Sequence, residues 1–441
     1  METSPSEEPT INKLKLWLVL MPTMAAPGYV AAQNIGESRG VPEASLAAEP
    51  SYDSSRRGSP LPHIDRIAGA VVLGSETFSV VDGKGGTIYI VDASTGLVLA
   101  DLSAEPEPLE RPIRLLDQLP GGRLVAWRPQ DGDFLKVYSS MGALEDSIPW
   151  LHGLGFGRPK PAGVLPDGTV ISRTSGGSAS IPGVTGGRDA TVENTVRYEV
   201  QSAGGRLIVA EALVTDFATV TVPLGRGSSF QSTRMVFGDQ VLFARSGTHL
   251  VIAPTGASAA SVYDGAGALT DTIPIPGTRL PVSEALVTAQ RYQRIAEARE
   301  TGQTGQRMRL VAAAAEYMGR NYEPVNSDSL IILELPAKGT APPIDRMLAD
   351  PTGRIWFRLT VMPNDTHARW CVWDVSRREY SFWLALPREN SLLGAFPNSL
   401  LIQGTDDEGR PRILVTPFTV SGASERPATS TQVPCEKGQP A

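Results

Sequence analysis

The segment HGLGFGRPKPAGVLPDG (residues 152–168) combines three alternating glycines with a histidine, an arginine and a lysine. A glycine-rich basic loop can hold a phosphate group on its backbone amides. A P-loop, however, needs the spacing G-x-x-x-x-G-K-S/T, which this segment lacks. Pro159 and Pro161 also exclude a helix directly after the glycines, so no helix N-terminus can face an anion here. We therefore interpret the segment as a connection between two β units.

Basic residues in this and neighbouring segments are the candidate ligand-binding groups. Guanidinium and ammonium groups recognise carboxylates and phosphates, although a rim of solvated charges is the alternative. The candidates are His152, Arg158, Lys160, Arg128, Arg173 and Arg358.

No catalytic or metal site is predicted from motifs. The four histidines, at positions 63, 152, 249 and 367, show no spacing typical of metal ligands, and no Cys-x-x-Cys pair occurs. No order of Ser, His and Asp typical of a catalytic triad stands out either. Many aspartates, including Asp92, Asp167, Asp264 and Asp350, stand in turn sequences, where their side chains are expected to stabilise the turn itself.

Cys371 and Cys435 are the two cysteines of the chain. In an exported protein they can pair, which would attach the C-terminal tail to the β unit that contains Cys371. A buried free thiol at Cys371 is the alternative, because aromatic residues surround it in sequence. These aromatic residues are expected to pack between β units rather than to form a ligand cage; they are Trp356, Phe357, Trp370, Trp373, Phe382 and Trp383.

The composition bounds the class of protein. A net charge of −7 argues against nucleic-acid binding, which requires clustered Lys and Arg. Lys13 and Lys15 precede an apolar run that ends in Val30-Ala31-Ala32, which is the pattern of a cleaved export signal. We predict a signal peptide over 1–32, a disordered leader over 33–64 and a disordered tail over 421–441, with no transmembrane span in the mature chain. The protein is then periplasmic or extracellular.

The remaining body, 65–420, consists of short apolar runs separated by Gly- and Pro-containing turns. Six units can be aligned, at 67–102, 113–149, 161–214, 239–275, 344–387 and 391–420. Four-stranded units of roughly 40 residues bury their faces when they are arranged radially, so the sequence predicts an all-β fold, a six-bladed β-propeller. The sixth unit is one strand short, and we expect Ile67–Leu73 to supply its outer strand. A stacked sandwich, or two smaller β domains, is the alternative fold.

The last two units, with DRMLADPTGRIWFRL, ARWCVWDVSRREYSFWLALP and LLGAFPNSLLIQGTDDEGRPRILVTPF, resemble exported six-bladed propellers of an uncharacterised group related to the NHL and TolB-like propellers. The resemblance implies the fold and no shared reaction. Some six-bladed propellers are metal-dependent lactonases whose channel cation is held by carboxylates and an asparagine from separate blades. Such ligands are dispersed in sequence, so no residue can be assigned to that role here.

Long insertions are expected on one face of the propeller, which is where binding functions usually arise. They are residues 175–194, the region around 224–235, and a helical insertion at about 281–320 between the fourth and fifth blades. Two helices are predicted there, 283–300 and 305–319. They either cover the channel or pack on the side of a blade.

The function favoured by the sequence is a non-enzymatic scaffold whose elaborated face holds a protein, a peptide or a small molecule. No cofactor is predicted. The alternative is a hydrolase or lyase with a cation in the central channel.

Overall fold

The computed structural model describes most of the chain beyond residue 40. The described residues are 41–56, 58–83, 86–102, 113, 115–128, 132–150, 159–178, 191–202, 205–224, 227–300, 335–420 and 435. The predicted signal peptide and most of the predicted tail lie outside them.

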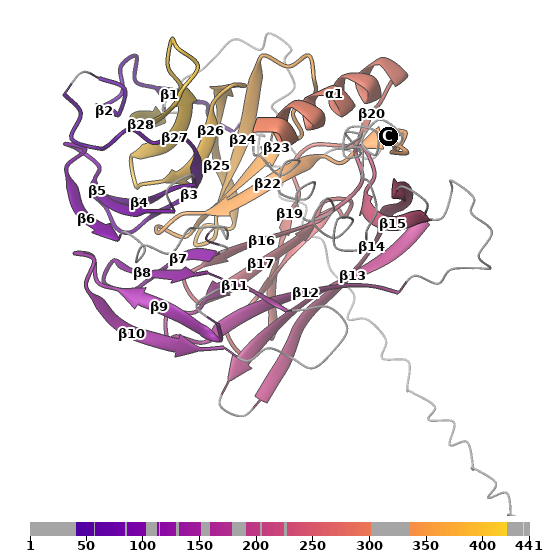
Figure 1. Cartoon of the computed structure of the whole chain (residues 1–441), viewed down its shortest axis with the longest axis horizontal. Helices are drawn as coiled ribbons and strands as arrows, with labels where there is room; N and C mark the ends of the chain where they lie inside the picture. Colours follow the sequence, from indigo (N-terminus) through magenta and orange to yellow (C-terminus); the bar gives the residue numbers. More distant parts are fainter. Residues whose placement is uncertain are drawn as a thin grey trace, which may run out of the picture. The chain divides into compact units, whose positions relative to one another are not determined.

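Six antiparallel sheets follow one another along the chain and form the blades of a propeller (Figure 1). Within each blade, the first strand in sequence is innermost, and it contacts innermost strands of neighbouring blades. Blade 1 contains β3 (Ile67–Val72), β4 (Thr77–Asp82), β5 (Ile88–Asp92) and β6 (Val98–Leu102). Blade 2 contains β7 (Leu115–Leu119), β8 (Arg123–Trp127), β9 (Phe134–Tyr138) and β10 (Leu144–Pro149). Blade 3 contains β11 (Lys160–Val164), β12 (Val170–Ser178), β13 (Thr191–Ser202), β14 (Gly205–Leu224) and β15 (Gly227–Arg234).

Blade 4 contains β16 (Val241–Ser246), β17 (His249–Pro254), β18 (Ala259–Tyr263) and β19 (Leu269–Pro274). Blade 5 contains β22 (Ile344–Ala349), β23 (Arg354–Leu359), β24 (His367–Asp374) and β25 (Glu379–Pro387). Blade 6 contains β26 (Ser391–Ala395), β27 (Ser399–Thr405), β28 (Pro411–Val420) and the N-terminal β1 (Ala44–Leu46), with β2 (Tyr52–Asp53) also paired to β28. Helix α1 (Glu284–Glu300) and the short pair β20 (Leu280–Pro281) and β21 (Thr340–Ala341) lie between blades 4 and 5. The predicted six-bladed propeller with a helical insertion at this place is confirmed.

Apolar residues on both faces of each blade hold the ring together. Successive residues of a strand point to opposite faces, so neighbours such as Val80 and Val81 of β4 enter two different hydrophobic clusters. Ile355 and Trp356 of β23 do the same. Each of these clusters lies between two adjacent blades, so every blade is buried by its neighbours rather than by itself. The predicted packing role of the aromatic residues is confirmed by Trp356 and Trp370, which are fully buried between blades 5 and 6.

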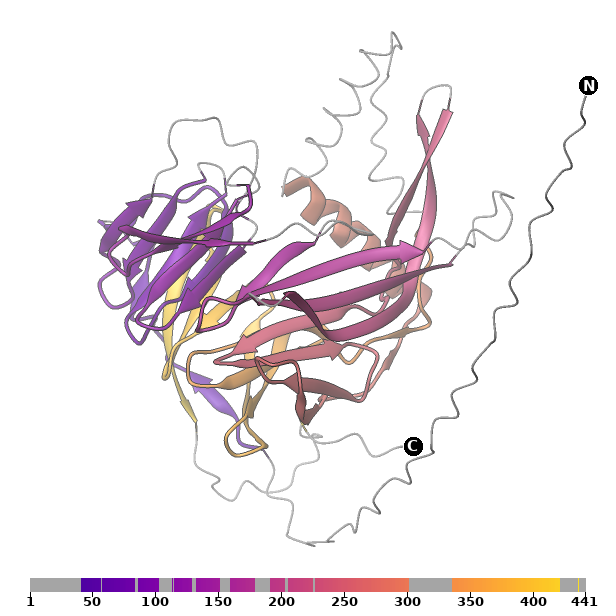
Figure 2. The ribbon, with the colours of Figure 1, turned by 90° about the horizontal axis from the view of Figure 1, so that it is seen from below.

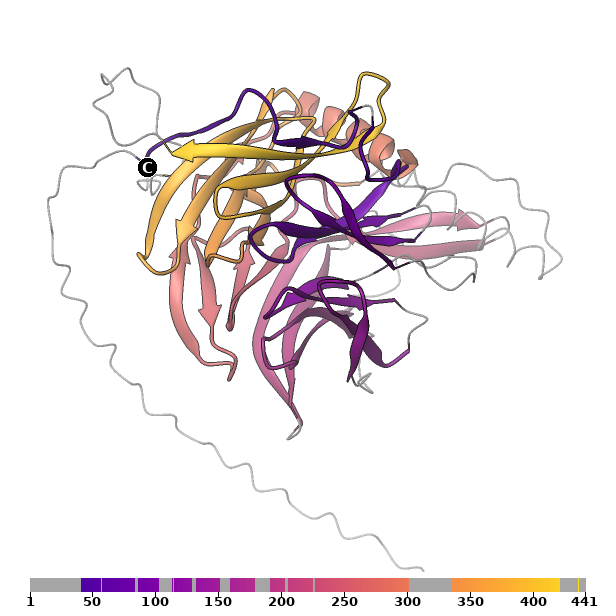
Figure 3. The same cartoon turned by 90° about the vertical axis from the view of Figure 1, so that its left-hand side faces the viewer.

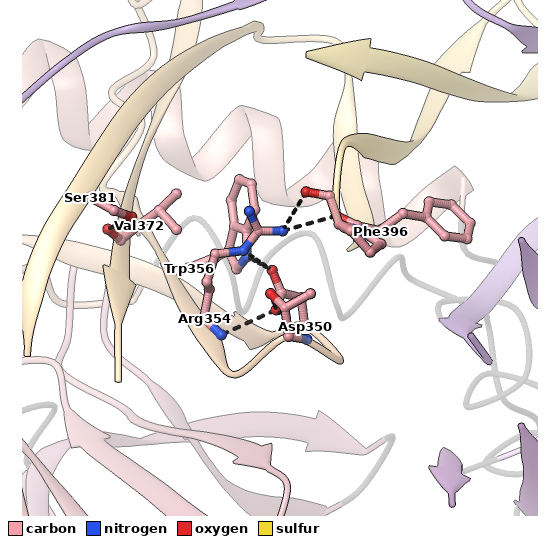
Figure 4. A network of polar contacts seen from close by, with 8 residues as sticks. Asp350, Arg354, Trp356, Val372, Ser381 and Phe396 are labelled. Carbon is pink, nitrogen blue, oxygen red and sulfur yellow. Dashed lines mark hydrogen bonds and ion pairs between the residues drawn. The ribbon is translucent and has the colours of Figure 1, made fainter. Parts of the chain in front are cut away.

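The aspartates of the turns stabilise them as predicted, and Asp350 does more. Its Oδ1 accepts hydrogen bonds from the backbone amides of Thr352 (2.9 Å) and Arg354 (3.1 Å). Its Oδ2 accepts from Arg354 Nε at 2.6 Å and from Trp356 Nε1 at 2.9 Å. The Arg354 guanidinium then donates to the carbonyl oxygens of Phe396 and Pro397 in blade 6, so the network joins two blades (Figure 4).

The ring closes with a segment that the sequence analysis assigned to the disordered leader. Strands β1 and β2 pair antiparallel with β28, so the prediction of a disordered 33–64 is wrong for the described residues from 41 onward (Figure 3). Ile67–Leu73 was expected to complete the last blade, but Ile67–Val72 is the innermost strand of blade 1. The N-terminal segment takes this position because β28 would otherwise leave a free sheet edge. Pairing with β28 also buries Ala44 and Tyr52.

Blade 3 also differs from the prediction. The region around 224–235 was expected to be a loop, but Gly227–Arg234 forms a fifth strand, β15, which extends the blade as a hairpin with β14 (Figure 2).

Helix α1 begins one residue after Ser283, whose Oγ accepts the amide of Leu286 at 3.4 Å. Within α1, Tyr292 is 61% exposed, whereas Ile295 is buried. The predicted second helix lies outside the described residues. Helix α1 is neither long nor apolar enough to cross a lipid bilayer.

Candidate functional site at the mouth of the channel

The six innermost strands begin on one face of the propeller, which we call the connection face, because the chain passes from blade to blade there. The strand order places Lys160 at the start of β11, Arg128 directly after β8 and Arg358 near the end of β23 on this face. Arg173 is the register partner of Lys160 across β11 and β12. His152 and Arg158 lie outside the described residues. The topology therefore places the described candidates on one face, and their role in binding stays a prediction.

The structure does not bring these candidates into a single cluster. Lys160 and Arg173 are exposed and opposite each other on blade 3. Arg128 donates to the carbonyl oxygen of Gly86 at 3.2 Å, which links blade 2 to blade 1. Arg358 forms an ion pair with Asp345, with 2.6 Å between Nε and Oδ1.

Arg358 belongs to a group of charged residues that the sequence analysis did not recognise. Arg346 of β22 is its direct register partner, so the two guanidinium groups leave the same face of blade 5. Arg234, at the end of β15, interacts electrostatically with Asp345 and forms a hydrogen bond with Gln240. We call these four residues the arginine cluster: Arg234, Arg346, Arg358 and Asp345.

The arginine cluster is short of negative charge. Asp345 is its single carboxylate; besides its ion pair with Arg358, its Oδ2 accepts the amide of Val361 at 3.3 Å. The Arg346 guanidinium makes no hydrogen bond or ion pair with any residue of the described chain. Burial lowers the pKa of Arg346 to about 10; the Arg358 charge contributes to this shift, and the Asp345 charge opposes it. Burial also lowers the pKa of Arg234.

A sequence signal for this cluster exists in IDRML (344–348). It places two adjacent charges on an innermost strand between apolar residues that enter the blade interfaces, Ile344 and Met347. Charges on such a strand are unusual because it is enclosed by the ring. The sequence pattern alone does not show that this strand is innermost, which is why the cluster was not predicted.

At the other end of the channel, a second ion pair ties four blades together. Arg245 of β16 approaches Asp117 of β7, with 2.7 Å between Nη2 and Oδ1, and also donates to the carbonyl oxygen of Gln118 at 2.7 Å. Asp117 Oδ2 accepts the amide of Val164 at the end of β11. The Gln118 side chain reaches the carbonyl oxygen of Leu73 after β3 at 2.9 Å. The innermost strands of blades 1 to 4 are thus joined where they end.

Arg245→Met is expected to lower the free energy of unfolding by about 2 kcal/mol, because it leaves the partly buried carboxylate of Asp117 without its charged donor. Urea unfolding followed by tryptophan fluorescence measures the change. Arg123→Met is the control, since Arg123 donates only an exposed hydrogen bond to Pro120. Equal losses in the two variants would mean that the Arg245 network adds nothing to the ring.

The innermost strands contain two carboxylates, Asp117 and Asp345, and each is paired with an arginine. Among the described residues, no group of three or more His, Cys, Asp or Glu side chains is placed to hold a metal ion. His63, His249 and His367 stand on different elements.

Helix α1 lies on the connection face and is held by groups from several blades. Arg294 donates to the carbonyl oxygens of Arg234 and Met235, between blades 3 and 4. Gln293 Oε1 accepts from Arg388, between blades 5 and 6, at 2.7 Å. A helix packed only on the side of one blade would not reach both connections. Helix α1 is therefore not packed on the side of a single blade, and that it covers the channel stays a prediction.

Cys371 and Cys435 are joined, with 2.09 Å between their sulfur atoms. Cys371 is fully buried in β24, and Cys435 is 2% exposed. The bond fastens residue 435 of the tail to blade 5.

Comparison with known proteins adds little beyond the architecture. No protein-family model matches the sequence, and no curated protein matches it. Among solved structures, the chain is similar to a member of the DUF4221 family from Bacteroides vulgatus, at 9% identity and a TM-score of 0.41, over 86% of this chain and 99% of that one. It is also similar to a luciferin-regenerating enzyme, at 11% identity and a TM-score of 0.37, over 86% of this chain and 96% of that one. A third similar structure is regucalcin, a calcium-binding protein from Agrobacterium tumefaciens, at 11% identity and a TM-score of 0.34, over 84% of this chain and 95% of that one. Because these identities and TM-scores are low, the six-bladed arrangement is assigned from the sheet topology of this chain and not from the comparisons.

Proposed function

We propose that this chain is an exported β-propeller that binds a small molecule, a peptide or a protein on its connection face and performs no catalysis. The observation that supports the proposal is that the carboxylates on the innermost strands already have charged partners. Both Asp117 and Asp345 are ion-paired with arginines, whereas a calcium or magnesium ion requires several free oxygen ligands. A cation would have to displace a guanidinium group at either position.

Export is part of the proposal. The basic and apolar N-terminal segment predicts cleavage after Ala32, and a disulfide between Cys371 and Cys435 fits an oxidising compartment such as the periplasm. A relationship to the NHL and TolB-like propellers is likewise proposed, on the resemblance of blades 5 and 6. The net charge of −7 fits a partner other than nucleic acid.

Elemental analysis of the full chain, produced for export and purified without chelator, tests the proposal. We expect no divalent cation to remain at stoichiometric level after dialysis. Native mass spectrometry of the same sample is expected to show a bound non-metal ligand, which the double charge reversal Lys160→Glu/Arg173→Glu weakens. About one equivalent of calcium, magnesium, manganese or zinc would contradict the proposal and favour a hydrolase or lyase with a channel cation.

A further inference from the structure

The arginine cluster has a charge pattern that is unfavourable in the empty protein. Side chains of a register pair on neighbouring antiparallel strands have Cβ atoms about 5 Å apart, and like charges at this distance destabilise a sheet. Arg346 and Arg358 are such a pair. Three guanidinium groups interact with the one carboxylate of Asp345, so within the described part of the chain the cluster carries a net charge of +2.

Packing alone does not explain this pattern. The guanidinium group of Arg358 lies 6.0 Å from the ring centre of Trp370 and is ion-paired with Asp345. These two contacts explain why an arginine is stable at position 358. Arg346 has no comparable partner, yet it stands on an innermost strand where burial penalises its charge. An apolar residue at this position would extend, at lower cost, the apolar cluster between blades 5 and 6 that Leu348 joins on the same face of the strand.

We propose that the arginine cluster is the binding site for a small dianionic ligand, whose phosphate or paired carboxylate groups accept hydrogen bonds from Arg346 and Arg358. A dianion would supply the two missing negative charges, and guanidinium groups bind such oxyanions in a bidentate manner. This inference rests on the proposed binding function and names the ligand class for it. The cluster stands close to where β22 begins, at the connection face.

Replacement of Arg346 is expected to affect ligand binding and thermal stability differently. Arg346→Gln removes one charge of the repelling pair, so we expect the ligand-free variant to unfold at a temperature equal to or above that of the wild type. A merely structural arginine would instead lower the unfolding temperature when it is replaced. Binding and stability are thus expected to change in opposite directions.

Thermal unfolding and titration calorimetry of the full chain with inorganic phosphate and with succinate test the site. Chloride at matched ionic strength controls for screening of surface charge. We expect at least one dianion to raise the unfolding temperature and Arg346→Gln to weaken its binding about tenfold or more, as for the loss of a charged hydrogen bond. Arg377→Gln is the matched control and is expected to bind like the wild type, because the Arg377 side chain is 69% exposed in the turn between β24 and β25, on the opposite face of the propeller.

Each outcome has a defined meaning. Binding of phosphate alone identifies phosphate or a phosphate ester as the ligand class, and binding of succinate alone identifies a dicarboxylate. Binding that survives Arg346→Gln, or no binding of either dianion, overturns the anion site. In that case the proposal that the connection face binds a ligand without catalysis is still tested separately, by the elemental analysis and by native mass spectrometry.

Discussion

Asp350→Ala is expected to lower the free energy of unfolding by about 3–5 kcal/mol, the range for removing one partner of a buried ion pair. The carboxylate of Asp350 is fully buried, and the Arg354 side chain is 14% exposed. Without Asp350, the Arg354 charge would remain enclosed beneath Trp356, and the Trp356 indole N–H would lose its acceptor. Chemical denaturation monitored by tryptophan fluorescence measures the loss.

The chain contains a matched control for this variant. Asp406 and Arg410 repeat the same local arrangement at the turn between β27 and β28, where Asp406 accepts the amides of Glu408 and Arg410 and pairs with the Arg410 side chain. That pair stands at the surface, where ion pairs contribute little to stability. We expect Asp406→Ala to cause a much smaller loss than Asp350→Ala. Losses of similar size would show that the turn geometry, and not the contact with blade 6, is what matters.

Cys435→Ser is expected to lower the free energy of unfolding by about 4 kcal/mol, if the disulfide acts by restricting the unfolded chain. The bond closes a loop across a sequence separation of 64 residues, and loops of this length lose much conformational freedom when they are closed. Cys371→Ser should give a similar loss because it removes the same bond. Denaturation with and without a reducing agent measures both effects.

The reducing agent also supplies the control. It should destabilise the wild type and leave the Cys435→Ser variant unchanged. A wild type that is insensitive to reduction, under conditions in which free thiols become detectable, would contradict a stabilising role for the bond between the tail and blade 5.

Local patterns predicted the repeating units well. Each blade depends on short apolar runs and on turn residues such as Asp350 and Gly353, which lie three positions apart in the sequence and act on the backbone of their own turn. The closing strand was missed because Ala44–Leu46 is three residues long and lies in a segment rich in Ser, Glu and Pro. Its position is set by the free edge of β28, far away along the chain, which no local pattern reveals.

The candidate site shows the same division between local and long-range information. The topology that places Lys160 and Arg358 on one face follows from the order of strands and could be predicted. The excess charge around Arg346 could not, because it depends on the register between β22 and β23, including the irregularity between Ile344 and Arg346, and on the approach of Arg234 from blade 3. Short-range sequence patterns do not encode such distances.

Anomalous diffraction from crystals of the full chain tests whether the arginine cluster binds an anion and the ring of innermost strands binds no cation. One crystal would be soaked in selenate, a dianion that scatters anomalously, and another in manganese. We predict a selenium peak beside Arg346 and Arg358, with the selenate oxygens within hydrogen-bonding distance of both, and no manganese peak inside the ring of innermost strands. A manganese ion bound by Asp117 or Asp345, or a cluster that stays free of selenate, would contradict this prediction.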